Sequence, residues 1–495
     1  MERIMLLIVA TFLSKIIAFG KELIFAYYYG TSDISDVYFM ALTIPVVVFG
    51  FFSSGISSGF VPTYKRACGD ESGIVEGNKF TNEINVILIF ICAVLITAYF
   101  PFNHAIVDFF AKGFNNAEKE ITIIFTNIMV FSIIFRSITT VMSSFLQSNE
   151  KTTAIGILSI PLNLGLIISI VFSAVCKNII FLPYGYLIAC TFQALVFVMI
   201  AKKNGYTIAP QLSLWNENVR CFLSSIVMLT IGSSVIQINV LVDKMLASTV
   251  SVGGVASLEY GNRILDLISG LFIISTSTVL FPKLVKNNKD KWKLSACFDE
   301  GIENLAIFLI PLSFVLFFFP KEIITLVYAR GAFDDNAVEL TSPILVFYGI
   351  GLIAIGIREI ISKLYFALGD MRTPVINSVI GVTLNIILNF VLVNYWGIGG
   401  LALASSITAT VMSISLLIQI RKKIILKIQM MFYVKVLLLS ILSVAICKVL
   451  IEHILIHSYH LNIIIGFIMF SIVYFSGLLF IGIFDIKTMR RAFKL

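Results

Sequence analysis

The sequence predicts an all-α protein that crosses a membrane many times. Hydrophobic residues make up 58% of the 495 residues and charged residues only 13%, whereas soluble domains carry about 25% charged residues. Apolar segments of about 20 residues, the length that spans a bilayer as a helix, recur along the whole chain. The mean hydropathy is +0.98. These observations exclude a soluble enzyme, a secreted disulfide scaffold and a nucleic-acid-binding domain.

Fourteen apolar segments are predicted to span the membrane. The first contains Lys15, Lys21 and Glu22 and lacks a small-residue cleavage site, so we interpret it as a span and not as a signal peptide. The predicted spans lie near 3–28, 34–60, 84–101, 121–147, 153–176, 179–201, 221–248, 254–282, 297–319, 338–368, 373–394, 398–420, 431–452 and 461–484.

Lys and Arg residues orient these spans, because basic residues accumulate in loops on the cytoplasmic side. If the chain begins inside, the inside segments hold most of them, whereas the outside segments hold few. Basic groups follow the second, sixth, eighth, twelfth and fourteenth spans, in segments 65–79, 202–220, 283–293, 421–427 and 486–495. We therefore expect both termini in the cytoplasm. Basic loops that face anionic lipid explain the net charge of +8 without nucleic acid.

The chain contains an internal repeat of six spans. Three pairs of identical residues in corresponding spans share one offset: Tyr38 and Tyr260, Arg136 and Arg358, Asn163 and Asn385. Because six is even, both copies enter the membrane from the same side, which predicts parallel repeats. The expected architecture is two six-helix lobes, 1–203 and 219–421, around a central cavity, then a helix pair at 430–485 and a basic cytoplasmic tail at 486–495. Alternating-access transporters are built in this way; a duplicated static scaffold is the alternative.

Charged side chains inside the predicted spans need partners or a wet cavity. A charge at the bilayer centre costs roughly 2.5–3.5 kcal/mol. Some of these residues are spaced to pair along one helix. Lys15 shares a helix face with Glu22, and Glu359 precedes Lys363 by four residues. The third such group lies on one face of the eighth span and consists of Glu259, Arg263 and Asp266.

Lys15, Lys21 and Arg263 are the predicted anion site. They lie well inside spans of different lobes, so they can face one cleft from both sides. Arg binds phosphate bidentately and Lys acts as a point charge. The predicted substrate therefore carries phosphate or carboxylate and must be shielded from the bilayer core.

Polar groups in the second lobe suggest a Na⁺ site. Carboxylate, amide and hydroxyl oxygens suit a hard cation. An equally good interpretation is hydrogen bonding between helices. We find no nucleophile–base–acid constellation and expect no cofactor beyond this ion, so the chain is predicted to be a transporter and not an enzyme. The candidate ligands are Asp243, Asn385, Asn389 and Ser405.

Several segments resemble the lipid II flippases of bacterial peptidoglycan synthesis, the MurJ/MviN family of the multidrug/oligosaccharidyl-lipid/polysaccharide exporter superfamily. The resemblance runs over most of the chain, in order, and includes the number of helices. It is carried by SKIIAFGKELIFAYYYGTSDISDVYFMAL (14–42), YGNRILDL (260–267), YARGAF (328–333), YFALGDMRTPV (365–375) and GIGGLALASS (397–406).

The resemblance implies a central cavity that opens alternately to each side, whose cations bind the diphosphate of a polyprenyl-linked glycan. Lys15 and Lys21 stand where the family usually has Arg, and Arg263 stands at the Arg of the eighth helix. Asp36 stands at an acid of the second helix, and Asp266 lies near Arg263. Glu22 and Glu259 complete the supporting acids. The four candidate Na⁺ ligands fall near a sodium site of some members, with an amide in place of one acid.

One departure from the family pattern concerns the second helix. The family often has paired arginines after its proline, whereas Phe49 and Gly50 occupy that place here. The expected function is translocation of an undecaprenyl-diphosphate-linked glycan, most simply lipid II, to the outer leaflet. The alternatives are a flippase for another lipid-linked oligosaccharide of the capsule or O-antigen type, a cation-coupled drug exporter, and a membrane glycan polymerase, for which the outer loops are short.

The resemblance also implies a setting for the protein. We expect a monomer in the bacterial cytoplasmic (inner) membrane that works with the cell-wall synthesis machinery. Its partners are the lipid-linked glycan and the membrane, and no nucleic acid.

Overall fold

The computed structural model describes residues 2–69, 73–151, 156–209, 217–424, 429–453 and 459–483. These residues form helices and their connections, with no strand among them. The predicted basic tail at 486–495 lies outside the described residues. The chain divides into two compact units, the first formed by Met1–Glu259 with Arg330–Ala337, and the second by Tyr260–Ala329 with Val338–Leu495. The predicted lobe boundaries stay a prediction.

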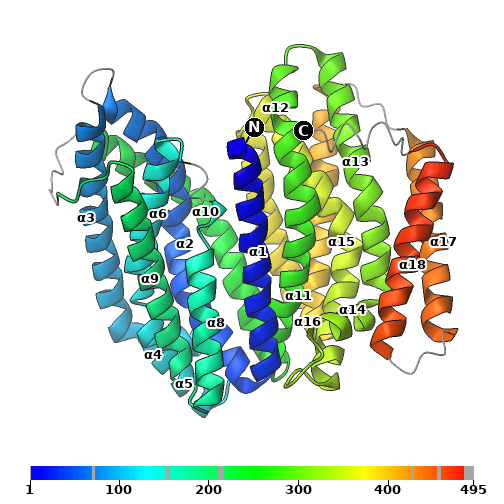
Figure 1. The fold of residues 1–495 in the computed structure, drawn as a ribbon, viewed down its shortest axis with the longest axis horizontal. Coiled ribbons are helices and arrows are strands. Elements are labelled where there is room, and N and C mark those ends of the chain that lie inside the picture. The colour runs from blue at the N-terminus through cyan, green and yellow to red at the C-terminus, as the bar shows by residue number, and fades with distance from the viewer. Residues whose placement is uncertain are drawn as a thin grey trace. The chain divides into compact units, whose positions relative to one another are not determined.

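The helices of the first unit run alongside one another (Figure 1). An aromatic cluster packs one end of α2 against α3, α6 and α10, with Phe60, Tyr64, Phe80 and Phe222 all nearly or fully buried. The Phe80 and Phe222 rings meet edge to face at 5.6 Å, a geometry that aromatic pairs favour. The helices are α1 (Glu2–Tyr29), α2 (Asp33–Cys68), α3 (Gly73–Tyr99), α4 (Asn103–Phe110), α5 (Asn116–Met129), α6 (Ser132–Ser148), α8 (Ile160–Val175), α9 (Phe181–Lys203) and α10 (Glu217–Val250).

Helix α11 (Gly254–Ile268) begins in the first unit and ends in the second. The second unit continues with the π-helical segment η2 (Ser269–Ile274). Its other helices are α12 (Ser275–Lys286), α13 (Lys291–Phe318), α14 (Pro320–Tyr328), α15 (Asp335–Ala367), whose first turn belongs to the first unit, α16 (Arg372–Ile420), α17 (Met430–His453) and α18 (Tyr459–Phe480).

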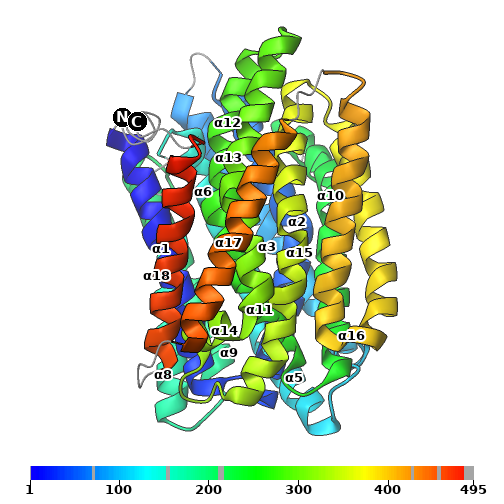
Figure 2. The same cartoon turned by 90° about the vertical axis from the view of Figure 1, so that its right-hand side faces the viewer.

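Helices α17 and α18 lie side by side in the second unit (Figure 2). They pack against α13 through buried apolar residues. The Tyr474 hydroxyl donates a hydrogen bond of 2.6 Å to the Ile307 carbonyl oxygen. Because a buried phenol needs a partner, this bond fixes the contact between α18 and α13.

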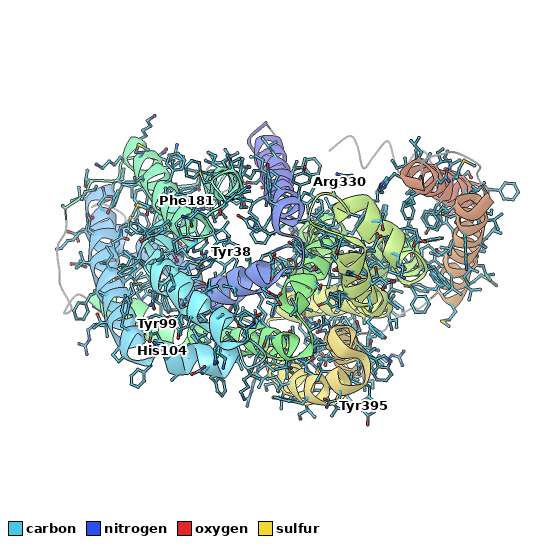
Figure 3. The ribbon with its side chains drawn as sticks, turned by 90° about the horizontal axis from the view of Figure 1, so that it is seen from below. Tyr38, Tyr99, His104, Phe181, Arg330 and Tyr395 are labelled. Atoms are coloured by element: carbon cyan, nitrogen blue, oxygen red, sulfur yellow. The ribbon has the colours of Figure 1, made fainter. Side chains whose placement is uncertain are left out.

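Helix α16 consists of two arms joined at Trp396 and Gly397, whose backbone leaves the helical region. Gly397 has a φ of +54°, which residues with a side chain adopt rarely. The arms return along each other, and Gly400 packs directly on the Leu392 carbonyl. Tyr395, beside the turn, is exposed and projects from the surface (Figure 3). The turn therefore separates the two predicted spans 373–394 and 398–420.

An ion pair joins the two ends of the α16 hairpin. Lys423 Nζ lies 2.5 Å from Asp370 Oδ2, and the Asp370 carboxylate accepts hydrogen bonds from the amide and hydroxyl of Thr373. The Lys423 ammonium and these two donors lower the pKa of Asp370 from 3.8 to about 2. Asp370 is therefore an ionised N-terminal cap for α16.

The predicted all-α membrane fold is confirmed. In the described part of the chain, nine helices are long and apolar enough to cross a membrane, and α5 with α6, bent by 41°, would be a tenth. Helices α1 and α10 and the shorter apolar α8 accompany them, so the number of fourteen spans stays a prediction. Two predicted connections, 102–120 and 320–337, contain the short helices α4 and α14.

Candidate functional site

Lys21 on α1 is held by the acid next to it in sequence. Its Nζ lies 2.7 Å from Glu22 Oε1, and both side chains are nearly buried. Lys15, almost two turns earlier, is half-buried and forms no ion pair with any residue that the structure describes. Among the described residues, the ion pair of Glu22 is formed with the adjacent Lys21 and not with Lys15. Lys15 thus presents a positive charge that no described acid neutralises.

Asp36 serves as the cap of another helix. Its carboxylate accepts hydrogen bonds of 2.7 Å from the backbone N–H groups of Gly253 and Ala256, at the start of α11. Asp36 is 3% exposed. Because free N–H groups and the helix dipole favour an anion at a helix N-terminus, this acid fastens α11 to α2. The Asp36 carboxyl group therefore forms a structural contact between α2 and α11.

Lys244 and Glu259 form a buried ion pair inside the first unit. Lys244 Nζ lies 2.9 Å from Glu259 Oε2, with side chains 9% and 10% exposed. The same ammonium donates a hydrogen bond of 2.7 Å to Thr43 Oγ1 on α2. The trio links α10, α11 and α2. Sequence spacing did not reveal it, since it grouped Glu259 with Arg263.

Arg263 belongs to the second unit and pairs with Asp266 on the same helix. Arg263 Nη1 lies 3.5 Å from Asp266 Oδ2, and the two side chains are 37% and 68% exposed. This predicted pair is confirmed. The helix changes to π-helical geometry at Ser269, directly after this pair, and π segments often mark functional sites. A guanidinium this accessible can exchange its partner for a ligand phosphate.

Three of the four candidate Na⁺ ligands meet between the arms of α16. Asn385 Nδ2 donates to Ser405 Oγ over 3.3 Å, and Asn389 Nδ2 donates to Asn385 Oδ1 over 2.9 Å. Both amides are nearly or fully buried. Asp243 belongs to the first unit, where Asn239 donates to it over 3.2 Å. The cluster can offer amide and hydroxyl oxygens to a hard cation.

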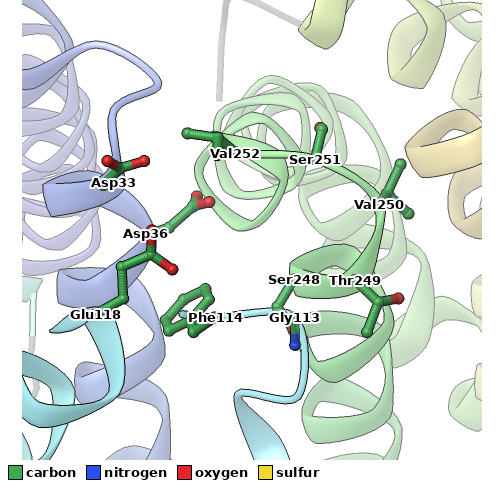
Figure 4. Close-up of a pocket in the computed structure, with 10 residues that line it drawn as sticks. All are labelled: Asp33, Asp36, Gly113, Phe114, Glu118, Ser248, Thr249, Val250, Ser251 and Val252. Carbon is green, nitrogen blue, oxygen red and sulfur yellow. The ribbon is translucent and has the colours of Figure 1, made fainter. Parts of the chain in front are cut away.

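A pocket of about 230 Å³ opens beside the start of α2 (Figure 4). Asp33, Asp36 and Glu118 approach it from one side and the α10–α11 turn, residues 248–252, from the other. Three carboxylates repel a diphosphate. This pocket is therefore unsuited to the predicted anion.

The segment 330–337 docks onto the end of α1 within the first unit. The Ala332 amide donates a hydrogen bond of 2.8 Å to the Tyr27 carbonyl oxygen. Gly30 has a φ of +54°, and a Cβ there would come within 2.2 Å of the Ala332 carbonyl oxygen. This close approach and the positive φ explain why a glycine, and no larger residue, fits position 30.

The sequence is similar to known membrane proteins over most of its length. A sequence model of the family described as "Lipid II flippase MurJ" matches residues 25–474. The lipid II flippase MurJ of Thermosipho africanus is 28% identical over 419 residues, 83% of this chain and 84% of that protein. The probable lipid II flippase MurJ of Buchnera aphidicola subsp. Baizongia pistaciae is 28% identical over 407 residues, 81% and 79% of the two chains.

Solved structures agree with the sequence relatives. A lipid II flippase MurJ in an inward closed conformation superposes with a TM-score of 0.84 at 26% identity, covering 96% of this chain and 98% of that one. An inward-facing multidrug resistance transporter of the MATE family has a TM-score of 0.69 at 13% identity, covering 85% and 97%. The second likeness shows the fold alone. The family match spans most of the chain, and the chain therefore belongs to the lipid II flippase MurJ family.

Proposed function

We propose that this protein is a lipid II flippase, a transporter and not an enzyme. The observation that carries the proposal is the family match over residues 25–474, supported by the TM-score of 0.84 with a MurJ structure. The chain moves the peptidoglycan precursor from the inner to the outer leaflet of the bacterial cytoplasmic membrane. It does so by alternating access, in which the central cavity between its two lobes opens to one side of the membrane and then to the other. It acts as a monomer that serves the cell-wall synthesis machinery.

Lys15, Lys21 and Arg263 hold the diphosphate in this proposal. The charge of Lys15, which pairs with no described acid, and the accessible guanidinium of Arg263 support it. Arg263 exchanges Asp266 for the substrate, because a charge-assisted bidentate bond to phosphate is stronger than a single exposed ion pair. Glu22 holds Lys21 in place until the substrate binds.

Na⁺ coupling is the second part of the proposal. The buried amides of Asn385 and Asn389, together with the Ser405 hydroxyl, support a cation site at α16, completed by Asp243. Binding of an ion stabilises the folded state that binds it. We therefore expect NaCl, compared with choline chloride at equal ionic strength, to raise the melting temperature of the wild type. The Asn385→Ala variant should show no such difference; a difference equal to that of the wild type would refute the site.

A second substrate class has one observation in its favour. Helix α2 carries no Lys or Arg before Lys65, so it contributes no cation to a diphosphate site near its middle. A flippase for a capsule or O-antigen lipid-linked glycan is therefore the alternative function. Cation-coupled drug export has only the shared fold in its support.

Binding of lipid II by the purified protein tests the proposal. Native mass spectrometry with lipid II should show a stoichiometric complex, and Arg263→Ala should weaken it by tenfold or more. Lys321→Ala is the matched control, because Lys321 belongs to the same unit, is exposed and forms only an exposed ion pair with Glu339. Equal binding by wild type and Arg263→Ala would refute the role of Arg263. A complex with another lipid-linked glycan and none with lipid II would favour the alternative.

A further inference from the structure

Arg136 is a partly buried cation without an acidic partner in the described part of the chain. It lies on α6 in the first unit, where its guanidinium stacks over the Phe49 ring of α2 at 5.2 Å. Its Nη1 donates a hydrogen bond of 3.3 Å to the Tyr186 hydroxyl of α9. Phe49 and Tyr186 are 3% and 2% exposed. Three helices thus meet at this one charge.

The hydrogen bonds of Arg136 are incomplete. A guanidinium has five N–H donors, yet Nε is buried and meets no acceptor among the described residues. Its hydrogen-bond partner Tyr186 is a phenol, which is neutral at pH 7. A cation–π contact offsets only part of the cost of burying a charge. An anion in the working cycle would complete the site.

The repeat provides an internal comparison. Arg358 holds the corresponding position on α15 in the second unit. An acid, Glu359, directly follows Arg358, whereas Ser137 follows Arg136. The repeat therefore does not by itself explain an arginine that pairs with no described acid.

Arg136 and Lys21 both belong to the first unit. Glu22 holds Lys21, and Tyr186 holds Arg136. Tyr38 of α2 lies among the helices of the same unit (Figure 3) and is 2% exposed. Helix α2 supplies no cation before Lys65, and Arg136 reaches its Phe49 ring from α6.

We propose that Arg136, positioned by Tyr186 and Phe49, forms a phosphate-binding subsite of the first unit, which takes one phosphate of the lipid-linked diphosphate. Assigning this phosphate to lipid II rests on the proposed function. The Tyr186 hydroxyl orients one edge of the guanidinium, and the Phe49 ring fixes its plane. The remaining N–H groups then present the fork that binds phosphate oxygens bidentately.

Binding of inorganic pyrophosphate to the purified full-length protein tests the subsite, followed by lipid II and phosphatidylglycerol as separate probes. Arg136→Gln should weaken pyrophosphate and lipid II by about tenfold to a hundredfold, the loss expected for a charged hydrogen bond. Arg136→Lys, which retains charge but not the fork, should give an intermediate loss. Lys203→Gln removes an exposed charge from the same unit and should leave both affinities unchanged.

A purely structural role predicts a different result. Arg136→Gln would then lower the melting temperature equally with and without pyrophosphate and leave its dissociation constant unchanged, which would overturn the proposal. If Arg136→Gln does not fold, Tyr186→Phe replaces it: a smaller but measurable loss of pyrophosphate affinity supports the subsite, and unchanged affinity overturns it.

The lipid probes separate this inference from the proposed function. Lipid II transport by a protein whose lipid II affinity does not depend on Arg136 overturns the subsite alone. Arg136-dependent pyrophosphate binding without lipid II binding supports the subsite and contradicts the proposed function. Arg136-dependent binding of phosphatidylglycerol alone assigns the charge to a membrane lipid and overturns the substrate role.

Discussion

The buried ion pair of Lys244 and Glu259 should make the protein sensitive to the removal of either partner. Replacing Lys244 with Met removes the ammonium but leaves the Glu259 carboxylate in a site where it is only 10% exposed. The substitution also removes the donor to Thr43. The remaining acid must stay charged without its counter-ion or take up a proton. Either outcome lowers the free energy of unfolding.

The size of the effect follows from burial. Breaking a buried ion pair by removing one partner costs about 3–5 kcal/mol. Removing both charges, in Lys244→Met with Glu259→Gln, should return stability to within about 1 kcal/mol of the wild type, because replacement of a whole buried pair is often neutral. Lys321→Met is the matched control. Its ion pair with Glu339 has side chains 60% and 69% exposed, so it should cost less than about 1 kcal/mol.

Thermal unfolding of the purified protein measures these differences. A thiol-reactive fluorophore suits the assay, since Cys92, Cys190 and Cys447 are buried in the folded state. Lys244→Met should melt well below the wild type, and the double variant should melt close to it. If the two losses simply add in the double variant, the side chains are not coupled and the reasoning from burial is refuted.

Three further predictions concern contacts that position the helices. Asp36→Asn should cost about 1–2 kcal/mol, because it removes the anion at the N-terminus of α11; faster hydrogen exchange in the first turn of α11 would show it, and unchanged exchange would contradict it. Because its pKa is lowered from 3.8 to about 2 by Lys423, Asp370 contributes stability above pH 3.8 that is lost as the pH falls through about 2. Asp370→Asn should therefore remove part of the acid-induced fall in melting temperature; a fall identical to that of the wild type would count against this ion pair. Gly30→Ala should destabilise strongly, since its Cβ would meet the Ala332 carbonyl, and a melting temperature equal to that of the wild type would show that segment 330–337 is not docked there.

The helical membrane fold could be predicted because the bilayer imposes it. Apolar runs long enough to cross a membrane are visible in sequence, and local spacing found the Glu359–Lys363 pair, observed at 3.2 Å. The short helices α4 and α14 were missed because they are too short for an apolar span. The α16 turn was found from the break between two predicted spans around Trp396.

Long-range pairing could not be predicted in the same way. Asp36 caps a helix whose amide is 217 residues away, and Lys244 reaches Thr43 across 201 residues. Helical periodicity shows only which side chains share one helix face. The family resemblance suggested Asp36 and Glu259 as supporting acids; in the structure Asp36 caps α11 and Glu259 pairs with Lys244. The sequence identified Arg136 as a member of the repeat and as a cation inside a predicted span, but it did not indicate a partner.

Complementation in bacteria tests whether the chain translocates lipid II. The endogenous lipid II flippase of a test bacterium is depleted, this chain is expressed in its place, and the accessibility of lipid II on the outer leaflet is measured. We expect restored growth and restored accessibility, both lost in the Arg263→Ala variant at equal protein level. A chain that is inserted and stable in the membrane, yet restores neither growth nor accessibility, would contradict lipid II translocation.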